Sequence, residues 1–401
     1  MDSGSAVHAF MIEIPMNQTL SEKSASYREA FDLCLLKSRR NIRDLADQPS
    51  SWSSTIDGHY DAEAEDFFSI GNWTSSFHTG MALLAYRKTA DKFFLQQTLR
   101  LEPLYVRKVQ EERLNTMHDL GFLYSLYSVA LHRLTGDSRH RETGLHAAEA
   151  LAGRFHPTGK FIQAWGRMDE HDPNFLGLAI IDCMMNLPLL YWASEESGDP
   201  RFREIAIQHA DMTLARFVRK DDSVFHAFRF DAASGQPLRG ENFCGRAVDS
   251  HWARGTAWAI YGFALSHHYT QDERYLEIAR RLAWDFVSKL DEEIIPLWDF
   301  RLPADEEKIR DASAAAIAVC GIQQLERCGA ADPSLLAAKR KLLNRLCSSE
   351  YMDSGPSHHG IIKNAQVGDD RGQAINAYSS WGDYFFMEAL DFELHQQQGF
   401  W

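Results

Sequence analysis

The alternation of two kinds of apolar segment is the feature of this sequence that most restricts its fold. Segments such as Gly121–Leu131, Leu187–Ala193 and Gly255–Leu265 are apolar or small on all sides, which is typical of buried helices. Amphipathic stretches such as Arg201–Phe217 and Tyr275–Leu290 lie between them, with apolar residues three and four apart. We therefore expect six buried helices that begin near residues 77, 121, 187, 255, 311 and 381, and six amphipathic ones.

Short turns before the amphipathic stretches mark the repeat. Each turn carries an aspartate suited to cap the helix that follows: Asp91, Asp137, Asp199, Asp272 and Asp332. A helix pair of this length cannot bury its apolar faces alone, so neighbouring pairs must stack. The alternation of fully and half-buried helices favours an all-α, closed (α/α)6 barrel with six inner and six outer helices, and an open solenoid is the competing layout.

The links between the repeats contain the few strand signals. Ser223–Phe230 alternates in polarity and a turn at Gly235 follows, which predicts a β-hairpin, and Lys160–Trp165 is a weaker second case. No interdomain linker stands out. We expect residues 1–401 to form one catalytic domain, with residues 1–20 as an N-terminal extension.

Charge and composition exclude several functions. The net charge of −14 comes from 42 Lys and Arg against 56 Asp and Glu, and no basic stretch offsets it. That balance argues against nucleic acid and anionic membranes as partners. Met1–Leu20 lacks the pattern of a secretory signal, and the six cysteines form no CxxC pair. We expect reduced thiols, a cytoplasmic location, and a monomer or weak homo-oligomer.

Polar residues gather where the buried helices begin. If these helices form an inner ring, the six segments converge at one end of it. They are Trp73–His78, Met117–Asp119, Ile181–Asn186, Asp249–Arg254, Ile309–Asp311 and Tyr378–Asp383.

Two aspartates in these segments are candidates for acid–base chemistry. Asp119 precedes a buried helix, so a helix cap and a catalytic carboxylate are equally good interpretations. Asp182 has apolar neighbours on both sides, which would raise its pKa and keep it protonated, although a buried cap is the alternative. Pro188 is best tolerated in a first helical turn, so it predicts a helix start close to Asp182.

Other residues near these starts are candidates for substrate binding. Arg254 lies between Trp252 and Trp258 and needs an anionic partner, which could be a substrate carboxylate, Asp249 or Asp311. Trp73 and Trp165 could stack on sugars or pack in the core.

His226 could contact substrate or be a solvated loop residue, and His118, beside Asp119, is a further candidate. Because no cluster of ligands with metal-binding spacing stands out, we expect neither a metal nor an organic cofactor. Two carboxylates with aromatic residues and an arginine are typical of a protein that acts on glycans.

The same segments resemble a known family. Met117–Leu126, Ile162–Gly166, Ile181–Ala193, Trp252–Phe263 and Trp381–Leu390 are similar, in this order, to motifs of the unsaturated glucuronyl hydrolases of glycoside hydrolase family 88. The resemblance runs from about Trp73 to Leu390. It implies an (α/α)6 barrel, in agreement with the repeat.

The resemblance also implies an unusual reaction on oligosaccharides that end in a 4,5-unsaturated uronic acid. A carboxylic acid protonates C4, a cation forms at C5, and water adds there. The resulting hemiketal opens and releases the shortened glycan. By resemblance, Asp182 is the general acid/base and Asp119 the second essential carboxylate.

The resemblance further suggests that Trp73, Trp165, His226, Arg254 and Trp258 contact the sugars. Four positions depart from the family's usual residues: His78, Phe243, Cys244 and Thr256. We expect these positions to line the pocket, so they bear on the choice of leaving sugar.

Three other functions compete with this one. The first is hydrolysis of unsaturated galacturonyl-rhamnose from pectin, on the same fold. The second is an ordinary inverting glycosidase, whose two carboxylates would be about 6.5–9.5 Å apart. The third is a glycan-binding protein without activity, against which the retained aspartate pair argues.

Overall fold

The computed structural model describes residues 25–45, 53–60, 66–368 and 375–401. Its six inner helical segments are buried on nearly every side, as their composition predicts. They are α2 (Ser75–Thr89), the run of α5 (Leu120–Tyr124), the π-helical η2 (Ser125–Val129) and α6 (Ala130–Thr135), α8 (Leu187–Ser197), α10 (Ala253–Thr270), α12 (Ala312–Arg327) and α14 (Ser380–His395).

The outer helices are amphipathic and bury one face each. They are α1 (Tyr27–Asp44), the pair α3 (Lys92–Leu99) and α4 (Glu102–Gln110), α7 (Ser138–Ala152), α9 (Pro200–Arg216), α11 (Glu273–Ser288) and α13 (Pro333–Leu346). The expected cap aspartates before α3, α7, α9, α11 and α13 all accept a hydrogen bond from a backbone N–H of the first turn.

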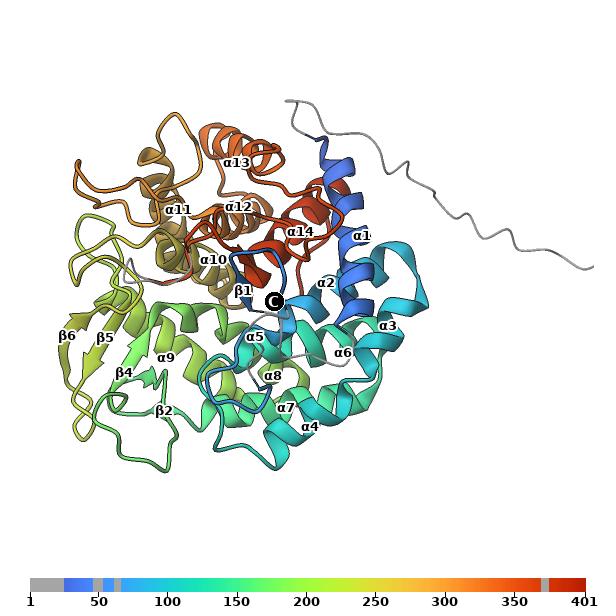
Figure 1. Cartoon of the computed structure of the whole chain (residues 1–401). Coiled ribbons are helices and arrows are strands. Elements are labelled where there is room, and N and C mark those ends of the chain that lie inside the picture. The colour runs from blue at the N-terminus through green and yellow to red at the C-terminus, as the bar shows by residue number, and fades with distance from the viewer. Residues whose placement is uncertain (1–24, 46–52, 61–65, 369–374) are drawn as a thin grey trace, which may run out of the picture.

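The inner helices form a closed ring. Each packs on the next in chain order, from α2 through α5, α8, α10 and α12 to α14, and α14 packs back on α2. In Figure 1, α13, α1, α3 and α4 lie at the periphery of this ring. The closure confirms the predicted (α/α)6 barrel and excludes the open solenoid.

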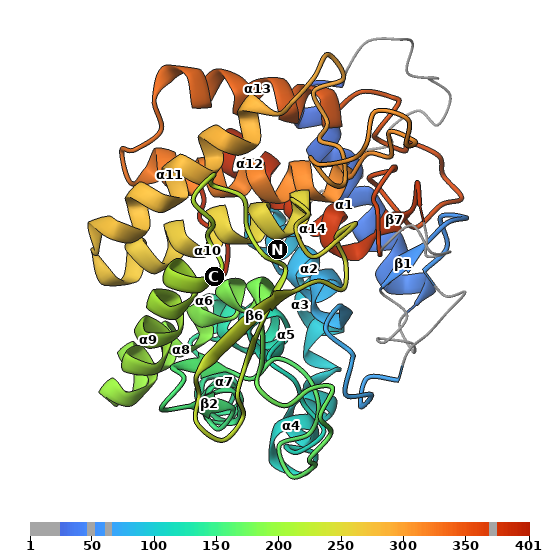
Figure 2. The same cartoon turned by 90° about the vertical axis from the view of Figure 1, so that its left-hand side faces the viewer.

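Small antiparallel sheets lie in the links, as expected. The predicted hairpin consists of β5 (Ala227–Phe230) and β6 (Pro237–Glu241), and the weaker case pairs β2 (Phe155–His156) with β3 (Phe161–Ile162). A strand that was not predicted, β4 (Leu178–Ile180), joins β5, and β1 (Ser54–Thr55) pairs with β7 (Tyr378–Ser379). Figure 2 shows β6 on the near side of the barrel.

Residues 1–20, the expected N-terminal extension, lie outside the described residues. All six cysteines are free thiols, and Cys34, Cys183, Cys320 and Cys347 are buried. Among the described helices, none combines the length and the apolar character that a membrane span requires.

Candidate active site

The polar segments that precede the inner helices meet at a pocket of about 280 Å³. Five of the six predicted segments contribute to its wall, and Asp311 of the sixth bonds to Arg254, which lines it. The lining residues are Ser53, Gly71, Trp73, Met117, His118, Asp119, Trp165, Ile180, Asp182, His226, Cys244, Trp252, Arg254, Val367 and Trp381.

The three-stranded sheet brings Asp182 next to His226. Ile180 of β4 pairs with Ala227 of β5, and the Ile181 N–H donates to the His226 carbonyl at 3.0 Å. Asp182 then lies in η3 (Ile181–Met185), a 3-10 turn that ends where α8 begins at Leu187. The start of α8 confirms the prediction from Pro188. A long-range strand pairing thus holds the Asp182 backbone at the pocket.

Asp119 is not a helix cap in the usual sense. It occupies the cap position before α5, but its side chain accepts no hydrogen bond from the described N–H groups of that helix. Its Oδ2 lies 3.5 Å from His118 Nε2, and the carboxyl is buried at the pocket wall. The catalytic interpretation of Asp119 is therefore the one that the geometry favours.

Burial raises the pKa of both carboxyls, and for Asp119 the charge of Asp182 adds to the effect. For Asp119, desolvation and the neighbouring Asp182 raise the pKa to about 8, against the opposing effects of Arg154 and of the Asn186 side chain. For Asp182, desolvation raises the pKa to about 6, and Arg254 is the largest opposing influence. Since these carboxyls interact, they titrate as a pair that retains a proton near neutral pH. Among the described residues, Asp182 Oδ2 has no hydrogen-bond partner.

The two histidines of the pocket are neutral. Desolvation lowers the pKa of His226 to about 3 and that of His118 well below its usual value. His226 Nδ1 accepts hydrogen bonds from the N–H groups of Phe243 at 2.9 Å and Cys244 at 3.1 Å. Because a nitrogen that accepts carries no proton, the ring proton is on Nε2. His226 is 4% exposed, so it is not the solvated loop residue that the sequence left open.

Arg254 forms an ion pair with a carboxylate of the protein itself. Its Nη1 donates to Asp311 Oδ2 at 2.7 Å, and its Nη2 donates to the Val367 carbonyl at 2.9 Å. Of the two carboxylates considered, Asp311 rather than Asp249 fills this role. The guanidinium also lies 4.7 Å from the centre of the Trp252 ring and remains part of the pocket wall.

The predicted tryptophans differ in position. Trp73 and Trp165 are half-buried and line the pocket, where Trp73 packs on Trp381 with 5.0 Å between ring centres. Trp258 is fully buried and is not part of the lining. It shares a helix face with Arg254 but lies one turn deeper, where it lowers the pKa of Asp182 without the geometry of a regular hydrogen bond.

The four residues that depart from the family pattern also differ in their position relative to the pocket. Cys244 lines the pocket, and the Phe243 ring packs edge-on against Trp165 with 4.9 Å between ring centres. His78 and Thr256 are buried and do not line it, contrary to expectation. The reason is that a helix buried on all sides does not reveal in its sequence which face turns toward the ring opening.

Several pocket residues were not singled out from the sequence. Trp252 and Trp381 stand at starts of inner helices, the same signal that identified Trp73, so that signal could have found them. Ser53 and Val367 come from loops distant in the sequence and carry no comparable signal.

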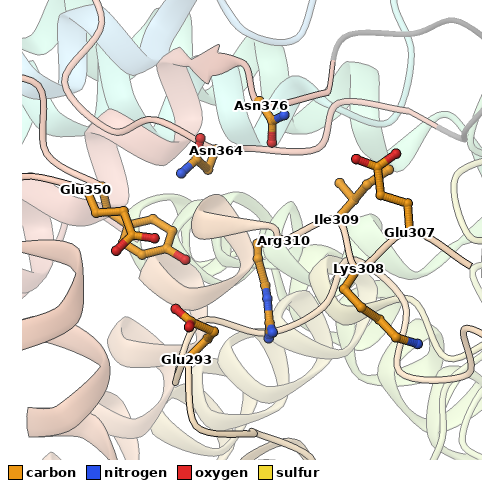
Figure 3. Close-up of a pocket in the computed structure, with 9 residues that line it drawn as sticks. Glu293, Glu307, Lys308, Ile309, Arg310, Glu350, Asn364 and Asn376 are labelled. Carbon is orange, nitrogen blue, oxygen red and sulfur yellow. The ribbon is translucent and has the colours of Figure 1, made fainter. Parts of the chain in front are cut away.

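A second pocket of about 310 Å³ lies beside the loop that carries Asp311. Figure 3 shows its charged side chains, which come from separate loops. Arg310 is already engaged there, since both its terminal nitrogens donate to Asp291, at 2.8 and 2.7 Å. Within the described part of the chain, no group of three or more His, Cys, Asp or Glu residues could hold a metal ion.

Comparison with known proteins identifies the family. The model of Glycosyl Hydrolase Family 88 matches residues 48–392. The unsaturated glucuronyl hydrolase of Bacillus sp. strain GL1 is 36% identical over 324 residues, 80% of this chain and 85% of that protein. The unsaturated chondroitin disaccharide hydrolase of Streptococcus pyogenes serotype M1 is 31% identical over 370 residues, 90% of each chain.

Solved structures of unsaturated glucuronyl hydrolases are also similar to this chain. Unsaturated glucuronyl hydrolase from Bacillus sp. GL1, described as responsible for the degradation of glycosaminoglycan, has a TM-score of 0.86 at 32% identity over 94% of this chain and 99% of that one. An aspartate-to-asparagine variant of the Streptococcus agalactiae enzyme, complexed with dGlcA-GalNAc6S, has a TM-score of 0.76 at 27% identity over 94% and 93%. The extent of the family match, together with the barrel, means that this chain belongs to glycoside hydrolase family 88.

Proposed function

We propose that this protein hydrates the C4=C5 double bond of a 4,5-unsaturated glucuronic acid at the non-reducing end of lyase-generated oligosaccharides. The observation that carries the proposal is the pair Asp119 and Asp182, whose raised pKa values keep a proton inside an aromatic-walled pocket. The names of the relatives and the glycan bound to the Streptococcus agalactiae variant agree with this substrate class.

Asp182 is the proton donor in this proposal. Its Oδ2 has no partner among the described residues, whereas Asp119 lies against His118. Transfer of the Asp182 proton to C4 leaves a cation at C5, and a water molecule adds to C5 while it returns a proton to the Asp182 carboxylate. The hemiketal then opens to a keto-acid and releases the shortened glycan.

The remaining wall residues bind the sugar rings. Trp73 and Trp165 offer apolar ring faces, and His226 offers its Nε2 proton as a hydrogen-bond donor. Trp258 lowers the pKa of Asp182 and does not line the pocket. We therefore assign Trp258 an effect on Asp182 and no contact with the sugar. In the form of the pair that reacts, Asp182 holds the retained proton, and Asp119, as the carboxylate, accepts hydrogen bonds from sugar hydroxyls or steadies the developing cation.

A single assay separates this reaction from its competitors. Hydration removes the absorbance of the vinyl carboxylate, so purified protein with an unsaturated chondroitin or hyaluronan disaccharide should lose that band as the free sugar appears. Release of sugar from saturated glucuronides without loss of the band would indicate an ordinary glycosidase. Preference for unsaturated galacturonyl-rhamnose would indicate the pectin enzyme, and binding without turnover a glycan-binding protein.

Substitution of the proposed acid gives a sharper test. Asp182→Asn should remain folded and lose activity by a factor on the order of 10²–10⁴, because an amide cannot donate the C4 proton. Circular dichroism and thermal melting confirm the fold. A folded variant with near-normal turnover would show that another group supplies the proton.

Other features of the proposal come from the sequence. A single catalytic domain, a reaction without metal or organic cofactor, a monomer or weak homo-oligomer and a cytoplasmic location stay predictions. Light scattering and chelation of the active protein would test the assembly and the cofactor.

A further inference from the structure

Asp119 is an exception among the aspartates that precede helices in this protein. Every other aspartate at a helix cap position in the described residues accepts at least one backbone N–H of its own helix. These caps are Asp91, Asp137, Asp199, Asp272, Asp311 and Asp332. The question is therefore which group accepts the N–H groups at the start of α5.

Asn186 provides one acceptor. Its side-chain Oδ1 accepts the N–H of Phe122, the third residue of α5, at 2.8 Å. This is the N–H that an ordinary cap residue would bond. Its Nδ2 donates to the backbone carbonyl of Asp182 at 3.2 Å, and Asn186 is completely buried. One side chain thus connects the start of α5 to the turn that carries Asp182.

The close packing of Gly121 on Asn186 supports this arrangement. A Cβ added to Gly121 would lie 2.3 Å from Asn186 Cα and 2.6 Å from its carbonyl oxygen. Only glycine allows the first turn of α5 to approach Asn186 this closely. The two segments that carry the aspartates are therefore joined directly, backbone against backbone.

We propose that Asn186 is a positioning residue that caps α5 in place of Asp119 and thereby leaves the Asp119 carboxyl to the substrate pocket. This inference deepens the proposed function and rests on it for its kinetic tests. Nothing in the proposal requires Asn186 to touch the sugar.

The electrostatic consequence follows from the contrast with an ordinary cap. The capping aspartate Asp137 has a pKa of about 2, chiefly through its hydrogen bonds from the Arg139 side chain and backbone N–H. Asp119 accepts no N–H of its own helix; the Asn186 side chain lowers its pKa, but desolvation and Asp182 outweigh this effect, and the pKa is raised. The titratable groups around Asp119 are Asp182, Arg154, His118 and Cys183. Of these only Asp182 changes charge between about pH 5 and 9, since His118 is neutral, Arg154 charged, and the Cys183 thiol raised in pKa.

Replacement of Asn186 tests the inference through the pH profile. In Asn186→Leu, the free N–H of Phe122 should draw the Asp119 carboxylate into the cap, where backbone donors more than replace the hydrogen bond that the Asn186 side chain gave it. We expect the basic limb of the kcat profile to move down by about one pH unit or more, and kcat to fall at least tenfold. Asn186→Asp keeps an acceptor for Phe122 and adds negative charge, so its basic limb should stay or move upward.

Asn41→Ala is the matched control. Asn41 is similarly buried and donates to the His359 carbonyl at 2.8 Å, and neither residue lines the pocket. Its replacement should lower the melting temperature without moving either limb. An Asn186→Leu profile identical to that of Asn41→Ala would overturn the inference, as would a downward shift in Asn186→Asp, which tests it even if the leucine variant does not fold.

A carboxyl titration by carbon-13 NMR separates this inference from the proposed function. The Asp119 signal should titrate at a lower pH in Asn186→Leu than in the wild type, whatever the substrate. If the wild type fails to hydrate unsaturated disaccharides but this shift appears, the proposed function is wrong and the positioning role stands. Hydration by the wild type without the shift would overturn the positioning role alone.

Discussion

At the scale of single residues, Arg254 has two duties that substitution can separate. It lines the pocket, and it also forms a buried ion pair with Asp311, whose side chain is completely buried. Removal of one member of a buried pair leaves the other charge without compensation. Arg254 also bonds the carbonyls of Gln366 and Val367, so it fixes the loop that closes one side of the pocket.

Arg254→Met should therefore cost about 3–5 kcal/mol of unfolding free energy. Arg254→Met combined with Asp311→Asn should recover part of this loss, because the unpaired carboxylate is gone. If Arg254 also attracts the substrate carboxylate, kcat/KM stays low in both variants. Chemical denaturation measures the unfolding free energy of each variant, and kinetics on the same preparations measures its kcat/KM. Recovery of kcat/KM together with stability would reduce Arg254 to a structural role.

The aspartate pair gives a second prediction at this scale, which concerns stability. Because the folded pKa of Asp119 is raised above its ordinary value of 3.8, the folded state binds a proton that the unfolded state lacks between about pH 4 and 8. Stability therefore falls as pH rises through this window, by at most ~1.4 kcal/mol per pH unit.

Asp119→Asn removes this dependence. The variant should be more stable than the wild type at pH 8, with a difference that shrinks toward pH 4. Thermal melting at several pH values measures it, and Asp137→Asn is the control, since the pKa of that exposed cap is lowered and not raised. A constant difference across the range would mean that Asp119 ionises freely in the folded state.

At the scale of elements, His226 anchors the loop after β6 on the side that faces the pocket. His226 Nδ1 accepts the N–H groups of both Phe243 and Cys244, and Phe243 in turn packs on Trp165. His226→Ala should loosen the Phe243–Cys244 part of this loop and raise KM by about tenfold, at a cost of ~1–3 kcal/mol for the lost hydrogen bonds. His226→Asn retains an acceptor and should recover part of the stability. An unchanged KM in the alanine variant would show that the loop needs no such anchor.

Some helices and strands of this fold could be predicted from the sequence, and others could not. The inner helices were predictable because a segment that is apolar on all sides has few alternatives. Five of the outer helices were predictable because a cap aspartate precedes them. Strand β4 was not, because Leu178–Ile180 merges with the apolar residues after it and its partner β5 lies about fifty residues away. The pairing that holds Asp182 beside His226 is nonlocal and has no local signature.

The same limit applies to the candidate site. Residues at the starts of inner helices could be gathered from the sequence, because the ring brings those starts together. The depth of Trp258 and the capping role of Asn186 could not, since both depend on how one segment packs against another. Helix periodicity places Trp258 on the face of Arg254 but does not state where the pocket ends.

At the scale of the whole molecule, a chain of packed aromatic rings leads from the pocket into the core of the barrel. Phe122 packs against Trp73 at the pocket and against Trp401 deeper in the barrel, with 5.5 and 5.9 Å between ring centres. Trp401 stacks on Phe385 at 5.7 Å, and its indole N–H donates to Glu388 at 2.9 Å. The pocket floor is thus part of one continuous core and is supported by residues that never meet substrate.

Trp401 tests this continuity. Trp401→Ala removes a fully buried side chain and should cost about 3–5 kcal/mol, with a cavity left beneath Phe122. Trp401→Phe keeps most of the packing but leaves Glu388 without one donor, so a loss of ~1–3 kcal/mol is expected. Because Phe122 adjoins Trp73, the alanine variant should also raise KM at temperatures where it remains folded, whereas the phenylalanine variant should not. Equal KM values in both variants, despite the difference in unfolding free energy, would mean that the pocket floor is rigid without support from below.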